Sequence, residues 1–243
     1  MAAFDCGLAA GADGLEFDVH LSKDGEPVII HDPTVDRTTD GTGAVAGLTV
    51  AELAALDAGY RFDPDGGFPW RGRAGSVPAL AAVLARHTRV PLIIELKTAD
   101  PRLAERVIDM VRAAGLTHRV TIGSFLPGAL DAVRSYAPEF RTGADVDEIK
   151  GGVADTLFTA AAPLPFHAFQ VPEIFAGQRI VTPDFVARAR AAGAGFTVWT
   201  VNDADTIRRL LEWGVDGIIS DRPDVAAATV RAFLESRSLD RDI

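Results

Sequence analysis

Cysteine is almost absent from this sequence, and so are long apolar runs. Cys6 is the single cysteine among 243 residues, which excludes an internal disulfide and leaves the redox compartment open. No apolar run approaches the roughly 18 to 20 residues that a membrane-spanning helix needs. The N-terminus also lacks the basic segment and apolar stretch of a secretory signal. These absences predict a soluble protein without an integral membrane segment, with the cytoplasm as its default location.

Basic residues are few relative to acidic ones. The chain has 24 Lys and Arg against 34 Asp and Glu, for a formal net charge of −10. A surface that binds nucleic acid or an anionic membrane needs a basic patch, so this balance argues against both partners. It suits a soluble protein or one that gathers cations. The sequence leaves the oligomeric state open.

The phosphate-binding loops of nucleotide-binding folds are also missing, because neither GxGxxG nor GxxxxGK[ST] occurs. From about residue 89 onward, short apolar runs alternate with helical patterns of about 10 to 15 residues, as in βαβ units. This repetition favours a TIM-type (β/α)8 barrel over an open doubly wound sheet, and one domain over residues 1–243. We expect helices over 100–115, 126–138, 147–161, 182–193, 202–214 and 222–236.

The N-terminal part of the chain holds two strands and an irregular segment. Residues 22–25 join the strands at 15–21 and 27–32 too tightly for a parallel crossover, so the second is expected to return antiparallel, as a hairpin arm. Residues 57–77 are rich in Gly and Pro and are expected to form a long loop or small insertion. Parallel strands are then expected to start near Leu15, Pro91, Val120, Phe140, Ala168, Phe196 and Gly217.

That count of parallel strands is one short of a closed barrel. Seven starts are present, whereas a barrel of this class has eight strands. The chain opens directly in a helical pattern over residues 1–13. We therefore expect the domain to be N-terminally incomplete, with its first strand missing before Met1.

Carboxylates lie in strands that otherwise have the composition of a core. Glu16 and Asp18 project from the same face of their strand, since side chains at i and i+2 share a face. Glu95 ends the next parallel strand, with Lys97 on the same face. Three converging carboxylates without a Cys or His cluster predict a hard-cation site for Mg²⁺ or Ca²⁺. Alternatively, Lys97 neutralises Glu95 alone and no metal binds.

One histidine stands out by its place. His31 ends the hairpin arm beside the acids, so it is a candidate general acid or base, although a solvent-exposed histidine at a hairpin tip is an equal alternative. The other four histidines are assigned to surface or structural roles. Trp199 lies near a strand end, where a tryptophan is more often core than substrate wall. A Ser-His-Asp site is not indicated, because no GxSxG is present.

The motifs together resemble the glycerophosphodiester phosphodiesterase family over almost the whole chain. They are, in order, "GADGLEFDVHLSKDGEPVIIHDPTVDRTTDGTG", "LIIELK", "TIGSF", "VWTVND" and "GVDGIISDRPD". The resemblance implies a (β/α)8 barrel that uses a divalent cation, Mg²⁺ or Ca²⁺, to hydrolyse glycerophosphodiesters to an alcohol and glycerol 3-phosphate. It makes Glu16, Asp18 and Glu95 metal ligands, His31 one of two catalytic histidines, and Lys97 a phosphate contact. Gln170 and Trp199 would line the pocket for the substrate, a small molecule.

The chain departs from the family in one respect. Family members open with a strand ending "HRG" and a "PENT"-type segment, which carry the other catalytic histidine, and this chain begins after them. We therefore expect residues 1–243 to hydrolyse glycerophosphodiesters poorly or not at all. A catalytically inactive phosphodiester-binding protein is the main alternative. A different barrel enzyme that uses the same cation is a further one. The alcohol that leaves is expected to depend on the loop over residues 57–77.

Overall fold

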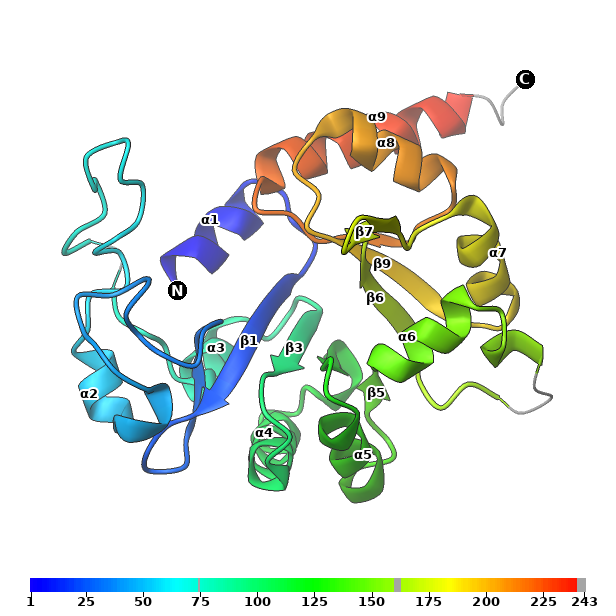
Figure 1. Ribbon diagram of the computed structural model, residues 1–243. Coiled ribbons are helices and arrows are strands. Elements are labelled where there is room, and N and C mark those ends of the chain that lie inside the picture. The colour runs from blue at the N-terminus through cyan, green and yellow to red at the C-terminus, as the bar shows by residue number, and fades with distance from the viewer. Residues whose placement is uncertain (74, 160–162, 240–243) are drawn as a thin grey trace. The chain divides into compact units, whose positions relative to one another are not determined.

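Strands and helices alternate along the chain, as Figure 1 shows for the computed structural model, which describes residues 1–73, 75–159 and 163–239. The chain divides into two compact units. Unit 1 comprises Met1–Asp5 and Gly14–Arg141, and unit 2 comprises Cys6–Asp13 and Thr142–Ile243. The predicted α/β class is confirmed, and the prediction of one domain over residues 1–243 stays a prediction. No helix in the described ranges is both long and apolar enough to cross a bilayer.

The sheet of unit 1 confirms the predicted hairpin. Its strand order is β2-β1-β3-β4-β5, and β1 pairs antiparallel with β2 but parallel with β3. The β3 strand in turn pairs parallel with β4. The tight turn at residues 22–25 fixes the antiparallel pairing of β1 and β2. The bounds are β1 Leu15–Leu21, β2 Pro27–Ile29, β3 Leu92–Leu96, β4 Val120–Gly123 and β5 Arg141–Thr142, and β5 lies at the boundary between the units.

Helices pack on this sheet through apolar faces that are visible in the sequence. In α4, Leu103, Val107 and Val111 recur at helical spacing and are fully buried. Asp100 caps its first turn by accepting from the Arg102 N–H at 3.0 Å, and Pro101 occupies the first helical position. The helices up to this point of the chain are α1 Ala2–Ala9, α2 Val50–Ala54, α3 Leu80–Arg86, α4 Pro101–Ala113 and α5 Pro127–Tyr136.

The predicted irregular segment is a loop held by aromatic and polar contacts. Described residues between 57 and 77 form neither helix nor strand. The Arg71 guanidinium lies 3.8 Å from the centroid of the Phe68 ring and 4.2 Å from that of Tyr60, and its Nε donates to the Tyr60 carbonyl at 2.7 Å. These contacts fix the loop without regular backbone pairing. The expectation that this loop determines which alcohol leaves stays a prediction.

Unit 2 is built on a second parallel sheet and an aromatic core. The strand order is β10-β9-β6, with β9 parallel to both neighbours. Phe169, Phe185 and Phe196 are almost fully buried, and their ring centroids lie 4.9 to 5.7 Å apart. The elements are α6 Val146–Val153, β6 Ala168–Pro172, α7 Pro183–Ala191, β9 Gly195–Trp199, α8 Ala204–Glu212, β10 Gly217–Ile218 and α9 Pro223–Leu239.

Two details of unit 2 differ from the sequence-based expectation. A small hairpin of β7 (Ile174–Phe175) and β8 (Gln178–Arg179) follows β6. Its turn places Ala176 at φ 49° and Gly177 at φ 79°, as the two-residue hairpin turns require. The helix expected over 147–161 ends as α6 at Val153, and its last two residues lie outside the described ranges.

All seven segments expected to be parallel strands form strands. They are β1, β3, β4, β5, β6, β9 and β10, and every register given between them is parallel. The strand expected near Phe140 is shorter than expected, because β5 begins at Arg141 and has two residues. The short apolar runs between helical patterns therefore located the strands correctly, although they overestimated the length of some.

Candidate active site

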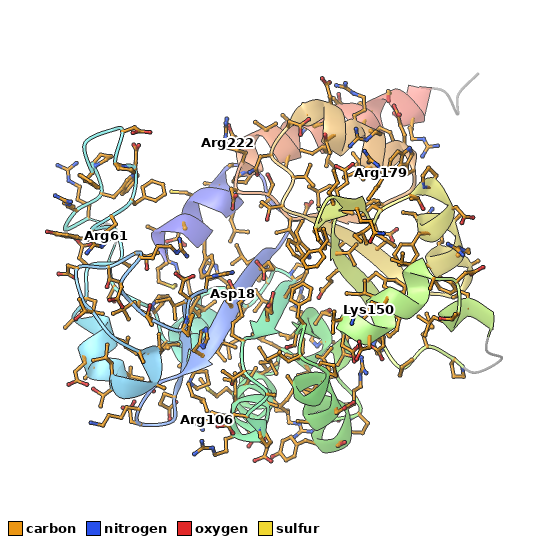
Figure 2. All side chains as sticks on the ribbon, in the orientation of Figure 1. Asp18, Arg61, Arg106, Lys150, Arg179 and Arg222 are labelled. Carbon is orange, nitrogen blue, oxygen red and sulfur yellow. The ribbon has the colours of Figure 1, made fainter. Side chains whose placement is uncertain are left out.

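Strand β1 places two carboxylates on one face. Leu15, Phe17 and Val19 are buried, whereas Glu16 and Asp18 alternate with them and are only partly covered. Figure 2 shows Asp18 on this strand. The alternation follows from the two-residue period of a strand, in which the apolar face packs in the core. The opposite face of β1 therefore carries polar side chains, of which Glu16 and Asp18 are partly exposed.

Strand β3 adds the third carboxylate. Its parallel register sets Asp18 against Glu95 and Glu16 against Ile93. One oxygen from each of Glu16, Asp18 and Glu95 lies within 4.8 Å of the other two. The predicted convergence of these three side chains is confirmed. Three oxygen donors this close, all partly buried, form a donor set of the type that Mg²⁺ and Ca²⁺ prefer.

Lys97 lies among these acids. Its Nζ donates to Asp18 Oδ1 at 2.8 Å and to Glu95 Oε1 at 2.8 Å, and all three side chains are 17 to 18% exposed. Burial disfavours the ammonium, but the hydrogen bonds to Asp18 and Glu95 outweigh it and raise the pKa of Lys97 above its usual value. Lys97 is therefore protonated at neutral pH. The structure thus contains both the three-carboxylate cluster and the ion pair of the alternative interpretation.

His31 ends the hairpin arm beside β1. The Ile30 N–H donates to the Asp18 carbonyl at 3.1 Å, and His20 Nε2 is 3.1 Å from the His31 carbonyl. The His31 side chain itself is 64% exposed. Its Nδ1 lies 2.8 Å from Asp32 Oδ1. The arm therefore fixes the His31 backbone next to the strand that carries Asp18, and the imidazole extends toward solvent.

The remaining histidines have the structural or surface positions that were predicted. His20 is buried, and this burial lowers its pKa despite the bond to the His31 carbonyl. His87 is also buried, whereas His118 and His167 are exposed. His20 also contacts the candidate catalytic residue, because its hydrogen bond to the His31 carbonyl holds that backbone in place.

Gln170 and Trp199 belong to unit 2 and lie on neighbouring strands there. In the β6–β9 register Gln170 is opposite Thr197, and Pro172 is opposite Trp199. Both side chains are partly exposed, because the buried face of these strands belongs to Phe169, Val171 and their neighbours. They therefore share the less buried face of the second sheet. Their expected part in lining a pocket stays a prediction.

Sequence reasoning missed two residues beside His31. Asp32 accepts from His31 and also from Arg37, whose Nε and Nη2 lie 2.5 and 2.9 Å from its two carboxylate oxygens. Both residues follow the arm in a loop without periodicity, so no helical or strand pattern links them. The adjacent letters His-Asp were the only signal available in the sequence.

Comparison with known proteins places this chain in a family. Residues 1–225 match the model of the glycerophosphoryl diester phosphodiesterase family. A glycerophosphodiester phosphodiesterase of Caldanaerobacter subterraneus is 32% identical over 239 residues, which cover 95% of this chain and 91% of that protein. Solved structures of the family are TIM barrels, which confirms the predicted fold class.

Two solved structures illustrate the likeness. A glycerophosphodiester phosphodiesterase from Agrobacterium tumefaciens is 32% identical, covers 93% of this chain and 91% of its own, and gives a TM-score of 0.73. An Oleispira antarctica phosphodiesterase, solved in complex with the product sn-glycerol-3-phosphate, gives a TM-score of 0.74 at 23% identity. It covers 94% of this chain and 90% of its own, and it shares the fold.

Proposed function

The chain belongs to the glycerophosphoryl diester phosphodiesterase family of phosphoric diester hydrolases, and we propose that it hydrolyses glycerophosphodiesters with the help of a divalent cation. The products would be glycerol 3-phosphate and an alcohol. The observation that carries the metal dependence is the cluster of Glu16, Asp18 and Glu95, whose oxygens lie within 4.8 Å of one another. The substrate is a small molecule with one phosphodiester group.

The residues present fit a hard cation. All three donors are carboxylate oxygens, and the cluster contains no thiolate or imidazole that would favour zinc or copper. Glu16, Asp18 and Glu95 would hold Mg²⁺ or Ca²⁺, since both ions bind such oxygens. When bound, the ion supplies positive charge that stabilises the developing charge on the phosphate oxygens.

The side chains around the cluster have matching roles in this proposal. Lys97 is a fixed positive charge at the same place, so it would contact a phosphate oxygen and add to the stabilisation. His31 would accept a proton from the attacking group or donate one to the departing alkoxide. A histidine acting in this way contributes on the order of 10²–10⁴-fold in rate. Gln170 and Trp199 would contact the glycerol or the leaving group.

An assay of glycerol 3-phosphate release tests the proposal. Residues 1–243 would be incubated with the glycerophosphodiesters of choline, ethanolamine, glycerol and inositol after treatment with EDTA. Mg²⁺ or Ca²⁺ would then be restored. We expect release to stop with EDTA and to return with one of the two ions. Release that is unaffected by the removal of metal would overturn the metal dependence, and no release from any diester with either ion would overturn the hydrolysis.

The same assay measures the rate. The expectation that residues 1–243 hydrolyse glycerophosphodiesters poorly or not at all stays a prediction, and a low but metal-dependent rate would agree with it. The alternative of binding without hydrolysis predicts instead that a phosphodiester raises the thermal midpoint in the presence of the ion, because a ligand of the native state stabilises it. In that case no glycerol 3-phosphate would form.

A further inference from the structure

An exposed imidazole needs a partner to hold it in one orientation, and His31 has one within the described residues. Its side chain is 64% exposed, so core packing does not fix the ring. The bond from Nδ1 to Asp32 Oδ1, at 2.8 Å, is the contact that sets its direction. A hydrogen bond at one ring nitrogen decides which nitrogen remains open to a substrate.

Asp32 is in turn held by Arg37. The guanidinium donates through Nε to Asp32 Oδ2 at 2.5 Å and through Nη2 to Oδ1 at 2.9 Å. Such two-bond pairing between planar groups is more directional than a single ion pair. Arg37, and after it His31, hold the pKa of the Asp32 carboxyl well below its usual range. The carboxylate therefore stays ionised at any pH near neutrality.

An ionised carboxylate only accepts hydrogen bonds, which determines the tautomer of His31. Because Asp32 has no proton to give, Nδ1 of His31 must be the donor in the bond between them. The neutral ring then carries its proton on Nδ1 and a lone pair on Nε2. Nε2 is the nitrogen that can take up or give a proton at the reacting atoms.

The backbone around the pair is fixed from both sides. His20 Nε2 lies 3.1 Å from the His31 carbonyl, which ties residue 31 to β1. The loop that carries Arg37 is closed by backbone bonds from Val35 to the Gly43 carbonyl at 3.0 Å and from Val45 to the Pro33 carbonyl at 2.9 Å. Arg37 and His31 therefore approach Asp32 from two anchored segments.

From this geometry we infer that Asp32 is a positioning residue for His31, kept in place by Arg37, and that it selects the Nδ1–H tautomer so that Nε2 faces the phosphodiester. The inference rests on the proposed function for the use of Nε2, whereas the tautomer is a property of the chain alone. The carboxylate also stabilises the imidazolium that forms when Nε2 takes a proton.

The first test observes the tautomer directly. The ¹⁵N resonances of the histidine rings would be recorded at about pH 8.5, well above the ordinary imidazole pKa of about 6.5. His31 is identified as the signal that disappears in His31→Gln. We expect a protonated Nδ1 and a bare Nε2 in the wild-type chain, and a loss of this preference in Asp32→Ala. A protonated Nε2 in the wild type, or an unchanged pattern in Asp32→Ala, would overturn the inference.

The second test is kinetic and uses a matched control on the same loop. Asp36 Oδ2 accepts from the Gly43 N–H at 2.9 Å, so Asp36→Ala perturbs the loop without a described contact to His31. We expect Asp32→Ala and the shape-preserving Asp32→Asn to lower kcat about 10- to 100-fold, as groups that orient a functional imidazole do, with KM little changed. Asp36→Ala should keep the wild-type kcat.

The two tests separate the possible failures. Equal losses in the Asp32 and Asp36 variants, or an undiminished kcat in both Asp32 variants, would contradict a positioning role. A wild-type chain that releases no glycerol 3-phosphate would refute the proposed function, and the ring resonances would still decide the positioning of His31.

Discussion

Two ion-paired clusters in this molecule have opposite compositions. In unit 1, one ammonium lies between two carboxylates, because Lys97 Nζ is 2.8 Å from both Asp18 and Glu95. In unit 2, one carboxylate lies between two guanidinium groups. Glu173 Oε1 accepts from Arg179 and, at 2.7 Å, from Arg209. The first is the acid-rich cluster and the second is the arginine-rich cluster.

The difference lies in what each cluster connects. The acid-rich cluster comes from β1 and β3, which are already paired by backbone hydrogen bonds, so its charges are not needed to join them. Glu173 follows β6, whereas Arg179 belongs to the β7–β8 hairpin and Arg209 to α8, so the arginine-rich cluster ties three elements together. This difference supports the proposal that the first cluster holds a ligand, whereas the second joins parts of the fold.

Removal of a carboxylate should therefore affect activity in one cluster and not in the other, and this is the largest effect we expect. Glu16→Ala and Glu95→Ala should each lower metal-dependent hydrolysis on the order of 10²- to 10³-fold, because electrostatic stabilisation of the transition state is lost. Glycerol 3-phosphate release across a range of Mg²⁺ or Ca²⁺ concentrations measures it. Glu173→Ala is the matched control and should keep the metal requirement. Unchanged metal dependence in both Glu16→Ala and Glu95→Ala would remove these residues as ligands.

Removal of the Lys97 ammonium tests the acid-rich cluster through the stability of the fold. Lys97→Met leaves Asp18 and Glu95 facing each other at partly buried positions, so it should lower the free energy of unfolding by about 1.5–3 kcal/mol in EDTA. A divalent cation would take over the lost charge. Urea unfolding with and without Ca²⁺ should show a larger gain from the ion in Lys97→Met than in the wild type. An equal gain in both would indicate that the ion does not bind beside Lys97.

The arginine-rich cluster should respond to the loss of its acid with a smaller change. Glu173→Gln weakens the bonds to Arg179 and Arg209, whose side chains are more than one-third exposed and well screened by solvent. We expect a loss of about 1 kcal/mol in the free energy of unfolding, independent of divalent ions. If Ca²⁺ restored the stability of Glu173→Gln, the distinction between the two clusters would not hold.

The smallest effect we expect is a pH dependence of stability that comes from a buried imidazole of unit 1 and not from either cluster. Burial is the main cause that lowers the pKa of His87, although Asp5 opposes it. The unfolded chain therefore binds a proton at a higher pH than the folded chain does, so stability falls as pH drops below about 6.5. Urea unfolding at about pH 7.5 and 5.5 should show a smaller fall in His87→Gln than in the wild type. A larger fall in stability in His87→Gln than in the wild type would show that folding does not lower the pKa of His87.

Sequence reasoning identified the parts of the site that follow from strand periodicity. Glu16 and Asp18 interrupt an apolar alternation, and Glu95 ends the next parallel strand, so their convergence could be predicted from spacing alone. Short apolar runs between helical patterns located the parallel strands. A period of two is a local property of the strand backbone, and for this reason the sequence alone predicts which side chains share a face.

Contacts between loops, and contacts across long sequence separations, could not be predicted. The Asp32–Arg37 pair lies in a segment without periodicity. Glu173 and Arg209 are 36 residues apart, and only the packing of α8 brings them together. The β7–β8 hairpin had a local signal in Ala176-Gly177, but a turn of two residues flanked by such short strands is a weak one.

Calorimetric titration tests whether Glu16, Asp18 and Glu95 hold a divalent cation. EDTA-treated wild-type chain, Asp18→Asn and Glu173→Gln would each be titrated with Ca²⁺ and with Mg²⁺. We predict that one ion binds per chain in the wild type and in Glu173→Gln, and that binding is lost in Asp18→Asn. Equal binding in the wild type and Asp18→Asn, or no binding of either ion to the wild type, would contradict it.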